Sequence, residues 1–96
     1  KNMPVFSGPE QINNPCARIG FYQVQNLPND RNLIVKEVEK IKEFAAKRGA
    51  NAIIIQQYDN EGVINLASYF LKYLDNLSPE DEEKIIAFAN SEVAIQ

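Results

Sequence analysis

The sequence predicts an α+β fold: a strand-helix-strand-strand core with an antiparallel hairpin, an extended N-terminal arm and an added C-terminal helix. Three observations predict it. An apolar stripe with helical spacing over 30–48 is soon followed by a run of three isoleucines at 53–55. An aromatic, strand-like segment at 17–25 precedes that helix. A proline-led acidic helix start at 78–82 comes last.

The chain length fits one domain. With 96 residues there is room for a single hydrophobic core, so we expect a domain over 17–96 preceded by an arm over 1–16. Hydrophobic residues make up 45% and charged residues 24%, as in ordinary globular domains. The formal charge of −3 argues against nucleic-acid binding, which needs a clustered basic surplus. With no histidine and a single cysteine, an intramolecular disulfide, His/Cys zinc sites and Ser-His-Asp or Cys-His catalysis are excluded.

The arm contains Pro4, Pro9 and Pro15, which disfavour a helix. Its large apolar residues either pack on the domain or stay loose, and both outcomes are open; they are Met3, Val5, Phe6 and Ile12. The chain begins at Lys1, without a basic-then-apolar leader. Two interpretations remain: a piece of a longer protein, or a mature exported protein whose signal peptide has been removed.

Residues 17–25 predict a strand, because aromatic and β-branched residues favour a pleated surface. We expect Ile19 and Phe21 to share one face, since side chains alternate along a strand. The opposite face would carry Arg18, Gly20, Tyr22 and Val24. A turn over 26–29 is expected to end the strand.

A helix is predicted over 30–48. Asn29 or Asp30 is its expected N-cap, and Gly49 follows its last turn at the position that favours a positive φ. Its buried stripe is expected to be Ile34, Val38, Ile41 and Ala45.

Residues 52–58 predict a buried strand. A right-handed crossover through the helix would place this strand parallel to 17–25, either adjacent to it or with one strand between. The residues 59–62 predict a type I turn closed by a left-handed Gly62, so the next segment returns antiparallel.

The segment 63–74 fits helical spacing and strand alternation alike. The turn before it and its aromatic residues favour the strand. A helix then starts with Ser78 as its cap and Pro79 in its first turn, and we expect it to end near Asn90. Its expected inner face is Ile85, Ile86, Phe88 and Ala89.

The stretch 44–55 reads Phe-Ala-Ala-Lys-Arg-Gly-Ala-Asn-Ala-Ile-Ile-Ile. It resembles a superfamily of small β-α-β-β domains. This superfamily includes the YbjQ-like proteins, labelled heavy-metal-binding, and the core of the Rcs stress-sensing outer-membrane lipoprotein. Gly49 would cap the helix, and the small Ala50 and Ala52 would let its end approach the sheet. Asn51 would bond backbone groups in the turn.

The resemblance implies a non-catalytic, lipoprotein-like domain of the cell envelope that acts in interaction or sensing. Its expected place is the periplasm or the outer membrane, with membrane contact only through a removed N-terminal anchor. A cytoplasmic domain without a tether is the alternative. No cofactor is implied, and the metal-binding label does not carry over, because histidine is absent and Cys16 lies outside the motif.

Tyr58, Tyr69 and Tyr73 are the candidate interface residues, since tyrosine combines contact area with a polar tip. Ordinary cross-strand packing around a core Phe70 is the competing interpretation.

No enzyme is predicted. Arg18 would lower the thiol pKa of Cys16 slightly, but the cysteine has no histidine base. Asp59 and Glu61 lie in a turn, where such residues commonly serve structure.

The alternative function is a small-molecule or weak metal-binding module. It would use the acidic residues 80–83, which otherwise favour the helix start. Whether copies of this protein associate depends on the helix that starts at Ser78. If it covers its own sheet, as we expect, the protein is a monomer, and otherwise a homo-oligomer follows.

Overall fold

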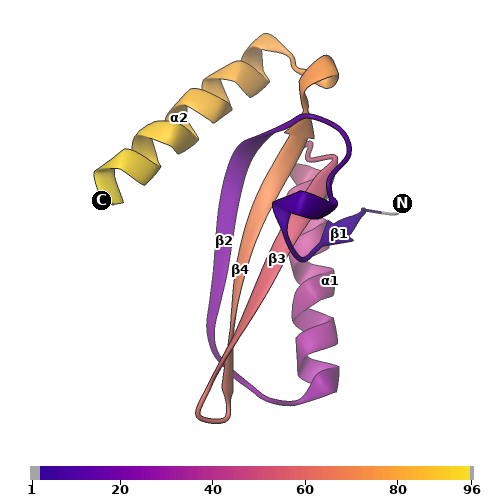
Figure 1. The fold of residues 1–96 in the computed structure, drawn as a ribbon, viewed down its shortest axis with the longest axis vertical. Helices are drawn as coiled ribbons and strands as arrows, with labels where there is room; N and C mark the ends of the chain where they lie inside the picture. The colour runs from indigo at the N-terminus through magenta and orange to yellow at the C-terminus, as the bar shows by residue number, and fades with distance from the viewer. Residues whose placement is uncertain (1–2, 96) are drawn as a thin grey trace.

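The computed structural model describes residues 3–95, and the side chains among them up to residue 90. It confirms the α+β fold, with a four-stranded mixed sheet and two α-helices in this part of the chain (Figure 1). The elements in chain order are β1 (Val5–Phe6), the 3-10 turn η1 (Pro9–Gln11), β2 (Cys16–Pro28), α1 (Arg31–Lys47), β3 (Ala52–Asn60), β4 (Val63–Tyr73), η2 (Leu74–Asn76) and α2 (Pro79–Ile95).

The strand order in the sheet is β1-β3-β4-β2. Because β4 is antiparallel to both β2 and β3, those two strands run parallel with β4 between them. This is the second of the two arrangements allowed by the crossover through α1. The strand interpretation of 63–74 is therefore confirmed, and so is the hairpin that joins it to β3.

The N-terminal arm is part of the domain. β1 extends the sheet by pairing parallel to β3, and the backbone N–H of Ile53 donates to the Pro4 carbonyl at 3.0 Å. Phe6 and Ile12 pack on a buried cluster on the sheet face away from α1. Of the two outcomes left open for the arm, packing on the domain is the observed one. The members of that buried cluster are Ala52, Ile54 and Leu71.

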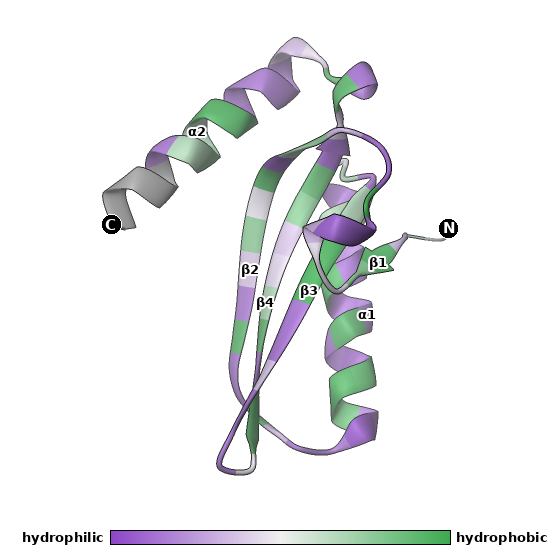
Figure 2. Cartoon of the chain, viewed as in Figure 1, coloured by the Kyte–Doolittle hydropathy of each residue, from purple (hydrophilic) through white to green (hydrophobic). Residues whose placement is uncertain are grey.

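Helix α1 covers the other face of the sheet. Ile41 and Ala45 are fully buried there against Ile53 and Phe70. The Asp30 carboxylate accepts a hydrogen bond from the backbone N–H of Asn32, so Asp30 is the N-cap. Figure 2 shows apolar and polar residues following one another along the ribbon of α1.

Strand β2 departs from the expected alternation. A register shift between Arg18 and Gly20 inserts an extra residue, Ile19, whose side chain is buried in the core under α1. After this bulge the alternation changes phase, and Phe21 lies on the opposite face, 43% exposed. The prediction that Ile19 and Phe21 share a face is therefore wrong.

Strand β2 also runs further than predicted, to Pro28. A second irregularity between Val24 and Leu27 accommodates the chain, with Asn26 at a φ of +61°. The Asn26 backbone N–H donates to Oδ1 of Asn65 on β4 at 3.0 Å. This contact across the sheet holds β2 beyond the point where its sequence pattern predicts a turn.

The hairpin between β3 and β4 is tighter than the predicted type I turn. Pairing continues to Asn60 and Val63, and only Glu61 and Gly62 lie between the strands. Both have positive φ, +49° and +86°. Two positive φ values match the twist of a two-residue hairpin, and a type I turn does not.

Helix α2 begins as predicted. The Ser78 hydroxyl accepts from the Asp81 backbone N–H, and the Asp81 carboxylate accepts from the Ser78 N–H at 3.0 Å. The helix continues to Ile95 instead of ending near Asn90, since neither glycine nor proline interrupts it. It leaves the sheet at a steep angle (Figure 1).

Candidate interaction surface

One face of the sheet has no helix lying flat across it. The side chains of each strand that point away from α1 form this open face; they include Arg18, Phe21, Gln23, Gln56, Tyr58, Ala67 and Tyr69. The register places them side by side, since Phe21 pairs with Tyr69 and Gln23 with Ala67. The arm covers the end of this face where β3 starts, and the rest is left uncovered by it (Figure 1).

Tyr69 is the centre of an aromatic cluster on the open face. Its ring lies 5.0 Å from that of Phe21 and 6.5 Å, edge-on, from that of Phe88 on α2. The Arg18 guanidinium carbon lies 4.5 Å from the Tyr69 ring centre, a cation–π distance. We call these four residues the Tyr69 cluster. Strand β2 contributes Arg18 and Phe21 to this cluster, β4 contributes Tyr69, and α2 contributes Phe88.

The three tyrosines predicted as interface residues share this face but are not one cluster. Tyr58 is 53% exposed and donates from its hydroxyl to Gln56 Oε1 at 3.0 Å. It lies opposite Asn65, near the hairpin, whereas Tyr69 is further along β4. Tyr73 is half-buried and packs on the cluster under the arm. Phe70 points to the other face and is in the core, as the competing interpretation expected.

Phe21, Phe88 and Arg18 are the surface residues that sequence reasoning missed. Strand alternation predicts that Phe21 shares a face with Ile19, because alternation alone does not reveal the bulge at Ile19. Gly20 is the available signal, because an isolated glycine in a strand often marks a bulge or a close approach. A Cβ on Gly20 would lie 3.0 Å from the Phe70 ring.

The motif at 49–52 serves the fold. Gly49 has a φ of +81°, as predicted, and its carbonyl accepts from Lys72 Nζ at 2.8 Å. Asn51 Oδ1 accepts from the Tyr73 backbone N–H at 2.8 Å, so its side chain joins two strands instead of closing the turn. Ala50 lies in the core on the α1 side. Ala52 lies in the cluster on the opposite face, under Phe6, so it does not help the helix end approach the sheet.

Cys16 is held as a protonated thiol. Its Sγ donates to the Asn14 carbonyl at 3.2 Å, and burial raises the thiol pKa. The expectation that Arg18 lowers this pKa is wrong, because the Arg18 guanidinium lies over the Tyr69 ring. A thiol with a raised pKa is a poor nucleophile at neutral pH.

The acidic candidates are engaged in the fold or exposed. Asp81 is buried, and its carboxylate lies 3.7 Å from Lys72 Nζ. The hydrogen bond from the Ser78 backbone lowers the pKa of Asp81, as do the nearby positive charges of Lys72 and Lys84. Asp59 accepts from the Gln57 side chain, and Glu61 lies in the hairpin turn. Across the described residues, no group of three or more Asp, Glu, Cys or His side chains is arranged to hold a metal ion.

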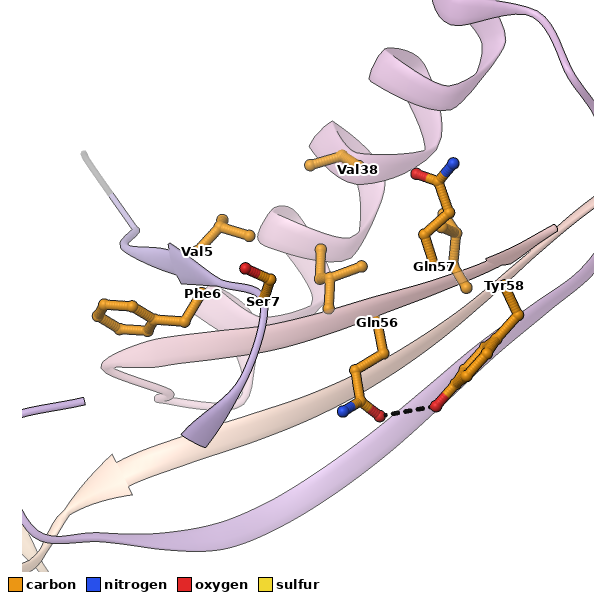
Figure 3. A pocket seen from close by; sticks show the side chains of 9 residues that line it. Val5, Phe6, Ser7, Val38, Gln56, Gln57 and Tyr58 are labelled. Atoms are coloured by element: carbon orange, nitrogen blue, oxygen red, sulfur yellow. Dashed lines mark hydrogen bonds between the residues drawn. The ribbon is translucent and has the colours of Figure 1, made fainter. Parts of the chain in front are cut away.

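A hollow of about 620 Å³ lies at the outer edge of β3, beside β1. Figure 3 shows Val5 and Phe6 of β1 next to it, Val38 of α1 above β3, and Gln56 and Tyr58 on the opposite side of that strand. A smaller hollow of about 190 Å³ lies at the edge of β2, between Tyr22 and Phe44. Both hollows are at sheet edges.

Comparison with known proteins gives no further guide. No protein-family model, curated protein or solved structure matches this chain. None of the helices within residues 3–95 has the length and apolar character needed to cross a bilayer. Function is therefore inferred from the surface that the fold presents.

Proposed function

We propose that this chain is a non-catalytic interaction or sensing domain that binds a protein partner through the open face. The observation that carries the proposal is the Tyr69 cluster, with Phe21 43% exposed on a sheet face that α2 contacts through Phe88 but does not lie flat across. Aromatic residues and arginine are enriched where protein interfaces gain most of their binding energy. Phe21 rests on Tyr69, so binding would order few additional side chains.

Tyr58 extends this surface toward the hairpin. Its hydroxyl is held by Gln56, and its ring is 53% exposed. Between Tyr58 and Phe21 the open face carries the small or uncharged residues Gln23, Gln56 and Ala67. Arg18, whose guanidinium lies over the Tyr69 ring, is the charged group that a partner meets at the Tyr69 cluster.

The cell envelope is the proposed location, and it rests on the resemblance of the motif at 44–55 to the envelope domains named above. The complete coding sequence tests it. We expect a leader that ends in small residues followed by cysteine, and incorporation of labelled palmitate into the protein in cells. A coding sequence without any leader would contradict the location and leave the interaction role standing.

Photo-crosslinking in the producing cells tests the binding surface. A photoreactive amino acid at Phe21 or at Tyr58 is expected to give one discrete crosslinked protein. The matched control places the same amino acid at Glu43, which is exposed on α1. Crosslinks of equal yield from Glu43, or none from the open face, would contradict the proposal.

The crosslinked partner, once purified, allows a quantitative test. Phe21→Ser is expected to weaken its binding at least tenfold, because truncating a central aromatic residue at an interface commonly has an effect of this size. Glu43→Gln is expected to leave binding unchanged. Equal melting temperatures of the two variants would show that the loss is not a loss of folding.

A further inference from the structure

The outer edge of β3 is only half occupied. The Ile53 backbone N–H points outward to the carbonyl of Pro4, the residue before β1, and backbone groups alternate in direction along a strand. The backbone groups of Ile55, Gln57 and Asp59 therefore point outward too. β1 pairs no further than Phe6 with Ile54, and no other strand of the described residues pairs on this side. We call Gln56–Asn60 the open edge.

The hollow beside β1 continues the line of that strand. Val38, Ile55 and Leu66 line it on the side of α1. Phe6, Gln56 and Tyr58 line it from the opposite face of the sheet (Figure 3). Because both faces contribute, the hollow lies at the edge itself and not above one face. Its position is that of a strand continuing from β1.

The two edges of the sheet differ in how they are protected. On the β2 side, the strand has two register irregularities, ends in Pro28 and has α2 packed beside it. Bulges, proline and covering elements are the features that prevent unwanted strand pairing. Between Ile55 and Asn60 the sequence has no proline, no lysine and no register irregularity. The edge of β3 is thus open to pairing, whereas that of β2 is obstructed.

We propose that the open edge binds an extended segment of a partner protein as an added strand. The backbone of this segment would pair with Gln57 and Asp59, and an apolar side chain would enter the hollow against Val38. Asp59 and the nearby Glu61 favour a neutral or basic segment. The inference rests on the proposed role in protein binding and assigns it a second, independent surface.

A second copy of this chain does not fit the open edge. In the antiparallel register that pairs Ile55 with Asp59 of the other copy, the other copy's Glu61 falls opposite Ile53, where β1 already lies. In a parallel, in-register pair, the two copies of β1 would occupy the same space. A linear segment meets neither obstacle, because it can stop beside Phe6, the last residue of β1.

An NMR titration tests the proposal. The probe is a synthetic peptide of alternating valine and threonine flanked by lysines. We expect its addition to shift the amide signals of Gln57 and Asp59 and to slow their hydrogen exchange. The signal of Gln23, whose backbone points outward from the edge of β2, is expected to stay in place. The same peptide with alternate backbone amides N-methylated keeps its side chains but loses the N–H donors on one of its edges. It is therefore expected not to bind.

Two proline variants provide the matched comparison. Gln57→Pro removes an outward N–H and leaves the pairing of Gln56 and Tyr58 with β4 intact, so it is expected to weaken peptide binding at least tenfold. Gln23→Pro makes the same change on β2 and is expected to leave binding unchanged. If Gln57→Pro does not fold, Asp59→Pro and the N-methylated peptide replace it.

Equal shifts at Gln23 and Gln57, binding of the N-methylated peptide, or full binding to Gln57→Pro would each overturn the proposal. So would the absence of any shift at the open edge. Phe21→Ser separates this inference from the proposed function, since it alters the open face alone and is expected to bind the peptide normally. Crosslinking from Phe21 without peptide binding would reject the edge only. Peptide binding without crosslinking would reject the open face only.

Discussion

Gly49 has a φ of +81°, a backbone conformation in which a Cβ is strained. A Cβ there would make only an ordinary contact with Lys72 Nζ, at 3.5 Å, so the cost comes from the backbone conformation. Gly49→Ala is therefore expected to lower the free energy of unfolding by about 1 kcal/mol. Urea denaturation measures it. Gly49→Asn is the control, with a smaller expected loss, because asparagine tolerates the left-handed region better. A neutral Gly49→Ala would contradict this account.

Ser68 is fully buried on the α1 side of β4, and its Oγ has no hydrogen-bond partner within the described structure. Burying an unsatisfied hydroxyl is unfavourable, so Ser68→Ala is expected to raise the free energy of unfolding by about 1 kcal/mol. Ser78→Ala provides a contrast of opposite sign, since it removes the cap of α2 and is expected to destabilise by about 1 kcal/mol. Calorimetric melting of both variants gives the comparison. Destabilisation by Ser68→Ala would show that the hydroxyl has a partner.

At the scale of the element, Asp81 joins the start of α2 to the sheet. The Ser78 hydrogen bond, with the charges of Lys72 and Lys84, lowers the pKa of its carboxyl in the folded state. A lowered folded pKa stabilises the protein above the ordinary aspartate pKa of about 3.9, and that stabilisation is lost as the pH falls through the lowered value.

Asp81→Asn keeps the shape of this side chain and removes its charge. The variant is expected to be less stable than the unchanged protein at pH 7, and the difference should shrink below about pH 4. Urea denaturation from pH 7 to pH 2 measures both proteins. A difference that stays constant over this range would mean that the carboxylate charge does not stabilise the fold.

For the whole molecule, the extent to which α2 covers the sheet decides whether the protein is a monomer. Lys84 Nζ donates to the Arg48 carbonyl, and Phe88 contacts Tyr69, so the helix does touch its own domain. Its cover is partial, because Ile86 stays 61% exposed.

Deleting residues 78–96 tests this cover. We expect loss of solubility and a shift from monomer to larger species, because half-buried aromatic surface becomes exposed. Sedimentation velocity measures the size. Phe88→Ser in the full chain is the milder variant, with the same direction of change expected. A truncated chain that remains soluble and monomeric would show that α2 covers nothing.

The sequence predicted the elements whose signals are local. The stripe of α1, the Asp30 cap, Gly49 and the isoleucine run of β3 each depend on neighbouring residues, and all are confirmed. The sequence also predicted the direction of β4, because two strands joined by a short turn run antiparallel. The choice of strand for 63–74 came from the same turn and from its aromatic content.

Only the tertiary structure decided the candidate surface. The bulge at Ile19 exists because the backbone of β2 must follow β4 while Ile19 reaches the core, and a contact between distant segments has no local pattern. This one shift moves Phe21 to the open face and creates the Tyr69 cluster. The arm likewise needs β3 before it can pair. Local chemistry determined which elements form, and long-range packing determined which side chains and which edge they leave exposed.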